Sequence, residues 1–178
     1  MKKQLFSVFL GLLLTSLCVS NVSGESTKNT IYGGVGFTWD FIATAPLPGL
    51  FFEYERSLHD MFSFGVEIGS EFLFIPASPD GSQFAFWPYA EVKGRWYPRA
   101  NILFLGMSFG ALFDLSTPIY EPTYLTLSPG LGWKVDIGKN NKWVMIPGIY
   151  WRILYNIENK TWLAGNLFKA NFSVGYQF

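Results

Sequence analysis

Residues 62–72, Phe-Ser-Phe-Gly-Val-Glu-Ile-Gly-Ser-Glu-Phe, alternate between large apolar side chains and small or charged ones. Phe62, Phe64, Val66, Ile68 and Phe72 share one parity, and every residue of the other parity is serine, glycine or glutamate. A β-strand sends successive side chains to opposite faces. The stretch therefore predicts a strand with one apolar and one polar face.

The same alternation recurs along most of the chain, and no segment shows a 3.6-residue apolar period long enough to indicate a helix. Eight strands are expected, at residues 30–41, 50–58, 62–74, 84–97, 102–114, 124–137, 143–154 and 162–178. Most have at least the 9–11 residues of a tilted membrane-crossing strand. The pattern predicts an all-β fold, an eight-stranded antiparallel up-and-down transmembrane β-barrel.

The connections between these strands alternate in length. The second, fourth and sixth links are short, at residues 59–61, 98–101 and 138–142. The first, third and fifth are longer and contain proline, at 42–49, 75–83 and 115–123, and the seventh, 155–161, is polar. Short turns at one end and longer loops at the other are typical of outer-membrane barrels.

The direction of the apolar face separates a membrane barrel from a soluble lipocalin-like one, which keeps apolar groups inside. Eight strands enclose a lumen that side chains just fill, and the non-apolar face is rich in glycine, which suits tight space. The Phe and Trp of the other face are too bulky for that lumen, so we expect them to face lipid. Pro88, Pro129 and Pro147 share the outward parity, where we expect local breaks or bulges. Arg56 also falls on it, close to a turn, where it could snorkel to the interface.

Charged residues fall almost entirely on the non-apolar face. We expect a lumen charge network of seven acids and five bases, Glu53, Glu55, Glu67, Glu71, Glu91, Asp114, Asp136, Lys93, Arg95, Lys134, Arg152 and Lys169. Buried charges need partners of opposite sign. These residues are therefore interpreted as lumen filling and pairing rather than as a binding site.

The first 24 residues have the composition of a secretory signal peptide. Lys2 and Lys3 precede an apolar run at residues 5–14, and a small, polar segment follows up to Gly24. The run is shorter than the ~20 residues of a spanning helix, so cleavage after Gly24 is preferred over a retained anchor, and lipidation at Cys18 is disfavoured by the large Leu17 before it. We predict a signal peptide at 1–24 and a barrel domain at 25–178, without cysteine.

The last residues form a recognisable pattern, since Phe172, Val174, Tyr176 and Phe178 lie at every second position. A terminal aromatic on an alternating strand resembles the C-terminal signal of bacterial outer-membrane barrels. With the leader and the eight strands, residues 30–178 resemble the small outer-membrane barrels of the OmpA-barrel, OmpX and OmpW type. The resemblance implies Sec-type export, recognition of the last strand by the barrel-assembly machinery, insertion into outer-membrane lipid, and a monomer. The roles implied are surface adhesion, defence, membrane integrity or passage of small hydrophobic compounds.

The sequence offers little for catalysis, cofactors or metals. The single histidine, His59, falls in a short turn beside Asp60. Small outer-membrane enzymes carry their catalytic histidine at the extracellular rim, and the short turns lie at the opposite end of the barrel. No cofactor motif is present, and one histidine without mature cysteine leaves a poor metal ligand set. The 13 basic residues are balanced by 13 acidic ones, so nucleic-acid binding is not expected.

Three functions stay open. The preferred one is a non-enzymatic integral outer-membrane barrel with a structural or surface-interaction role and an extracellular ligand that the sequence does not specify. The alternatives are a narrow, OmpW-like channel or carrier for small hydrophobic solutes and, less favoured, a soluble lipocalin-like ligand binder. The chain has fewer charged residues than a soluble domain usually has. Only 15% of its residues are charged and 19% are aromatic, whereas soluble domains have about 25% charged residues.

Overall fold

The structure is a computed structural model, and it describes residues 28–40, 45–78, 81–98, 102–113, 115, 123–138 and 142–178. The predicted signal peptide at 1–24 lies outside the described residues and stays a prediction. So does the proposed lumen residue Asp114.

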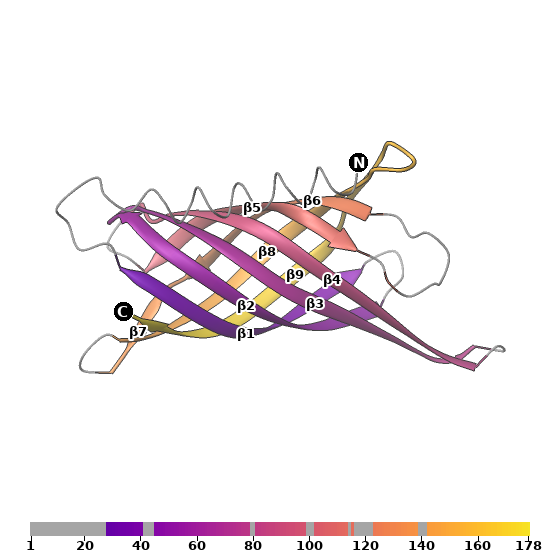
Figure 1. The fold of residues 1–178 in the computed structure, drawn as a ribbon, viewed down its shortest axis with the longest axis horizontal. Helices are drawn as coiled ribbons and strands as arrows, with labels where there is room; N and C mark the ends of the chain where they lie inside the picture. Colours follow the sequence, from indigo (N-terminus) through magenta and orange to yellow (C-terminus); the bar gives the residue numbers. More distant parts are fainter. Residues whose placement is uncertain are drawn as a thin grey trace.

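The chain forms a closed antiparallel barrel (Figure 1). Its strands are β1 (Asn29–Asp40), β2 (Ala45–His59), β3 (Phe62–Ser78), β4 (Gly81–Trp96), β5 (Leu103–Phe113), β6 (Thr123–Trp133), β7 (Val135–Ile137), β8 (Trp143–Asn156) and β9 (Thr161–Gln177). Each strand pairs with its sequence neighbour, β1 pairs with β9, and β6 and β7 both pair with β8. Because β6 and β7 are one strand interrupted at Lys134, the barrel is eight-stranded, as predicted.

Closure satisfies the backbone groups that an open sheet would leave at its edges. The β1–β9 ladder runs from Thr30 opposite Gln177 to Asp40 opposite Leu167. Beyond the ladder, Asn29 and Phe178 exchange two backbone hydrogen bonds of 3.0 and 2.8 Å. The first and last strands are therefore joined along the whole length of β1.

The two faces of the wall point as the sequence predicts. On the outside, Phe52 is 66% exposed and Met107 is 56% exposed, whereas the neighbouring inward residues Phe51 and Ser108 are buried. This arrangement is the reverse of a soluble barrel, in which the lumen is apolar. The apolar face therefore forms an exposed belt around the barrel.

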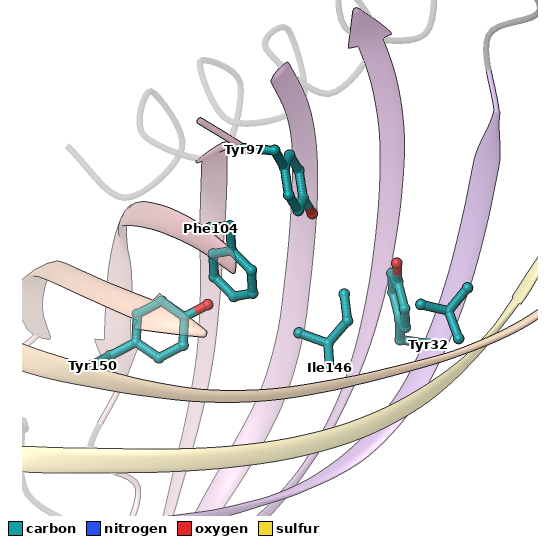
Figure 2. Packing of buried hydrophobic residues seen from close by; sticks show 6 residues of the cluster. Tyr32, Tyr97, Phe104, Ile146 and Tyr150 are labelled. Carbon is teal, nitrogen blue, oxygen red and sulfur yellow. The ribbon is translucent and has the colours of Figure 1, made fainter. Parts of the chain in front are cut away.

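Several aromatic rings fill the lumen, and the sequence reasoning missed them. Tyr32, Tyr97, Phe104 and Tyr150 pack with Val144 and Ile146 inside the wall (Figure 2). Five inward rings each lie opposite a glycine of the neighbouring strand, in the pairs Tyr32–Gly175, Phe51–Gly34, Tyr89–Gly69, Phe104–Gly132 and Tyr150–Gly130. A Cβ atom at any of these glycines would lie 2.6 Å or less from a ring carbon. The glycines thus leave the space that the rings occupy.

Two predicted loops are wrong in part, because strands extend into them. β2 begins at Ala45, within the expected loop 42–49, and the β3–β4 hairpin takes up most of the expected loop 75–83, projecting beyond the barrel in Figure 1. Pro46 and Pro48 pair with β1 only, since the β2–β3 ladder starts at Gly49 opposite Glu71. Proline is tolerated at a strand edge that needs no donor, so it did not mark a loop here.

The three outward prolines lie where one of their two ladders is interrupted. Pro88 pairs with β3, but the β4–β5 ladder starts one residue later, at Tyr89. Pro129 pairs with β5 and has no partner in β8, and Pro147 pairs with β9 beside the gap between β6 and β7. The expected breaks are present and follow from the missing N–H. The register shifts lie elsewhere, for example between Arg152 and Leu154.

Candidate functional site

The inward face of five strands places nine of the predicted charged residues in the lumen. Each is at most 4% exposed, and they are Glu53, Glu55, Glu67, Glu71, Glu91, Lys93, Arg95, Arg152 and Lys169. They come from β2, β3, β4, β8 and β9. Period-two alternation keeps them on one face of each strand, and closure of the barrel then brings the faces together.

One part of the network is a continuous chain of ion pairs that starts at Glu55. The guanidinium of Arg95 pairs with Glu55, and its Nη2 donates to Glu53 Oε2 at 2.8 Å. Lys93 Nζ lies 3.4 Å from the same Glu53 oxygen and also pairs with Glu67. The chain therefore links β2, β3 and β4 through alternating charges.

Glu67 contacts three side chains within this row of ion pairs. One of its oxygens accepts from Lys93, and the other accepts from Lys169 Nζ at 3.0 Å and from the Tyr89 hydroxyl at 2.9 Å. The side chain is completely buried. Two cations and one hydroxyl thus compensate for the loss of its hydration.

A second cluster surrounds Arg152. Its Nη1 lies 2.6 Å from Glu71 Oε1 and its Nη2 lies 3.0 Å from Glu91 Oε1. Glu71 also accepts from the hydroxyl of Thr38, while Glu91 accepts from Ser108 and Thr126. These hydrogen bonds and ion pairs cross the lumen from β1 to β8 and connect opposite walls of the barrel.

Aromatic rings stack on the cations between the two clusters. Lys169 Nζ lies 4.1 Å from the centre of the Tyr89 ring, and Arg152 lies 5.1 Å from the same ring. Lys93 lies 5.0 Å from the centre of the Tyr150 ring. A hollow beside Lys93 and Tyr150 is too small to hold a water molecule. Around Lys93 and Tyr150 the side chains therefore fill the lumen.

Of the two remaining predicted members, Lys134 lies at the edge of the network near Glu55 and Tyr97, and Asp136 lies outside it. Lys134 interrupts the strand between β6 and β7, is partly exposed, and lies 5.7 Å from the centre of the Tyr97 ring without an ion pair among the described residues. Asp136 is exposed in β7, so its placement in the network is a correction. Asp136 lies opposite the buried Val144 and so has the inward parity, but β7 is close to the turn at the end of the barrel and its residues are exposed.

Sequence reasoning missed the neutral members of the lumen. The hydroxyls of Tyr89 and Tyr97 donate to Glu67 and Glu55, at 2.9 and 3.0 Å. Thr38, Ser108 and Thr126 do the same for Glu71 and Glu91. Their inward parity was the available signal, but charge alone was used to select residues.

The proposed C-terminal signal lies on the outer wall at one end. Phe172, Val174 and Tyr176 of β9 face outward, and Tyr176 stacks edge-on with Trp143 of β8 at 5.4 Å. Phe178 follows the strand and is exposed. The four residues of the proposed signal are therefore exposed on the folded barrel, and their recognition by an assembly factor stays a prediction.

The remaining candidates for chemistry are few. His59 ends β2, is exposed, and accepts a 3.3 Å hydrogen bond at Nδ1 from the backbone of Met61. Within the described ranges, no three His, Cys, Asp or Glu side chains are arranged to hold a metal ion. The described residues also include no helix long and apolar enough to cross a membrane.

Comparison with known proteins identifies similar folds but no sequence relatives. No protein-family model matches the chain, and no curated protein matches it. Among solved structures, Ail, the attachment invasion locus protein of Yersinia pestis, superposes with a TM-score of 0.55 at 10% identity, covering 86% of this chain and 100% of that one. Neisserial surface protein A superposes with a TM-score of 0.52 at 10% identity, over 86% and 96% of the two chains. The chain therefore has the fold of the small eight-stranded bacterial outer-membrane β-barrels.

Proposed function

We propose that this protein is an integral outer-membrane β-barrel with a structural or surface-interaction role and without enzymatic activity. One observation carries the proposal: the outer wall is an apolar belt, while the lumen is filled with paired charges. An apolar exterior of this extent is stable in lipid and unstable in water. The solved structures that share the fold include a surface protein and an attachment protein.

The outer wall carries the features of a lipid-facing surface. Exposed side chains along β5, for example Leu105, Met107 and Phe109, are all apolar. Trp133 and Trp143 lie near the end with the short turns, where tryptophan favours the membrane interface. In the proposed orientation, the short turns face the periplasm and the longer links face outward.

The lumen supports a role that does not depend on chemistry inside the barrel. The buried glutamates are each held by a cation or a hydroxyl, so they are pairing groups rather than free acids or bases. The single histidine lies at the end with the short turns. A contribution to membrane integrity, or recognition by the outer links, fits this arrangement better than catalysis does.

Biogenesis follows from the same proposal. Residues 1–24 would direct Sec-type export, and the alternating residues Phe172 to Phe178 would be read by the barrel-assembly machinery. Where the described strands form the closed wall, both of their edges are paired, so a second copy has no strand edge to add to there. The proposed form in the membrane is a monomer without a cofactor.

Gel mobility of the outer-membrane fraction tests the proposal. Unboiled protein in detergent is expected to migrate as a folded barrel, and boiling is expected to shift the band because the ladder and the charge network are lost. Recovery of the protein in the soluble fraction, with no shift on heating, would contradict membrane insertion and support a lipocalin-like binder.

Electrical measurements in planar bilayers separate the structural role from transport. We expect no steady channels at low voltage, because eight strands enclose a lumen that side chains just fill and the hollow beside Lys93 and Tyr150 has no room for water. If steady channels appear and are weakened by neutralising Glu67 and Arg95, the narrow channel is the better description.

A further inference from the structure

Arg56 is a cation on the apolar outer wall of the barrel. It lies in β2, three residues before the strand ends at His59, and it pairs across the sheet with Asn29 of β1 and Phe64 of β3. Its face is otherwise lined by aromatic and aliphatic residues, including Tyr54 and the exposed Leu58. A guanidinium at this place requires a partner that comes from outside the barrel wall.

The side chain of Arg56 has no ion pair or hydrogen bond with another described residue. Its Nε is buried without a partner, as are those of Arg95 and Arg152, but the terminal nitrogens of those two arginines are paired with carboxylates. All four buried lumen cations, in contrast, contact carboxylates. A half-buried guanidinium without an acceptor is unfavourable. An anionic group in the surrounding lipid would satisfy it.

Asn29 supplies a second donor beside Arg56. The hydroxyl of Tyr54 donates to Asn29 Oδ1 at 2.8 Å and so orients the side-chain amide of Asn29, the cross-strand partner of Arg56. With Oδ1 engaged, Nδ2 is the group left to donate outward. A guanidinium and an amide N–H on one face suit the oxygens of a phosphate group.

The position along the barrel matches the headgroup level. β1 begins at Asn29 and β2 ends at His59, so the pair lies near the rim with the short turns. Exposed Lys28 and Lys142 lie on the same rim, where their carbonyls accept from Ser57 and Gln177. Basic side chains at this depth attract the phosphates of the adjacent leaflet.

We propose that Arg56 and Asn29 form a binding site for the phosphodiester of a glycerophospholipid in the leaflet next to the short turns. The site rests on the proposed membrane insertion. The acyl chains would lie along the exposed apolar residues of β1 and β2, and the phosphate would accept from Arg56 and Asn29.

Native mass spectrometry of the purified barrel, titrated with phosphatidylglycerol in detergent, tests the site. We expect Arg56→Gln to bind the first lipid about tenfold more weakly than the wild type, as expected for loss of a charged hydrogen bond. Arg56→Lys keeps the positive charge but loses the planar set of donors of the guanidinium, and its lipid affinity is expected to lie between those of the wild type and Arg56→Gln. Lys160→Gln, which removes an exposed cation from the β8–β9 turn at the other end, serves as the control and is expected to bind like the wild type.

Two further measurements separate the outcomes. Excess inorganic phosphate is expected to leave the lipid bound; displacement of the lipid by it would overturn the lipid assignment in favour of a free-anion site. Equal lipid affinity in wild type and Arg56→Gln, with both proteins showing the heat-dependent gel shift, would overturn the site and leave the membrane barrel intact. Absence of the shift in the wild type would instead refute the membrane barrel itself.

Discussion

Replacing Glu67 by glutamine is expected to lower the free energy of unfolding by about 3–5 kcal/mol, the usual cost of removing one partner from a buried ion pair. Glutamine keeps the volume of the side chain but not its charge. Lys93 and Lys169 would then lose the carboxylate that they share in the lumen. Denaturant unfolding of the barrel in lipid vesicles, followed by tryptophan fluorescence, measures the change.

Glu158→Gln is the matched control for this substitution. Glu158 is exposed in the turn between β8 and β9, so the same chemical change there is expected to alter stability by no more than about 0.5 kcal/mol. An equally small effect of Glu67→Gln would show that the lumen network does not stabilise the barrel.

Met107→Arg is expected to destabilise the barrel in lipid by about 2–4 kcal/mol, the cost of a cation on the lipid face near the middle of the membrane. Met107 lies near the middle of β5, on the outer wall, with exposed apolar neighbours on the same face. The same unfolding experiment in vesicles measures this cost.

Leu58→Arg controls for the depth of the substitution. Leu58 is exposed to a similar extent but lies next to the end of β2, where an arginine reaches the headgroups and is expected to cost about 0–1 kcal/mol. If both arginines are equally harmless, the outer wall does not face a hydrocarbon layer. That result would contradict the central element of the proposed function.

The two expected effects arise from opposite sides of one wall. In a soluble domain, an exposed methionine would contribute little to stability, and a fully buried glutamate would be unusual. Here the charges inside the narrow lumen are paired, while the outer wall is apolar, as expected of a surface that faces lipid. The pairing of Glu71 and Glu91 with Arg152 across the lumen follows the same rule.

The parts of the lumen that were not anticipated have specific causes. Tyr32 and Phe104 were missed because aromatics were expected outside, and their fit depends on Gly175 and Gly132 of the neighbouring strands. Asp136 keeps the inward parity opposite the buried Val144, but it lies near the turn end of the barrel and is exposed there, which alternation does not reveal. A pattern along one strand carries no information about the residue across the ladder.

The expected loops 42–49 and 75–83, which contain proline, are shorter than predicted because β2, β3 and β4 extend into them. Pro46 and Pro48 lie in β2, past the last residue that pairs with β3. At such an edge no donor is needed, so proline is compatible with a strand. Whether an edge exists depends on where the neighbouring strands stop pairing: β3 continues to Ser78 with β4 but pairs with β2 only as far as Glu71.

The alternation from Phe62 to Phe72 and its repeats were enough to determine eight strands, their two faces and the outward direction of the apolar one, since side-chain period and lumen size are local constraints. Only the tertiary structure decided which carboxylate meets which cation, as with Glu67 and Lys169, which are far apart in the chain. It also revealed that Arg56 has no partner among the described residues. These features depend on register between strands and on closure of the barrel, which bring together residues whose order along the chain does not relate them.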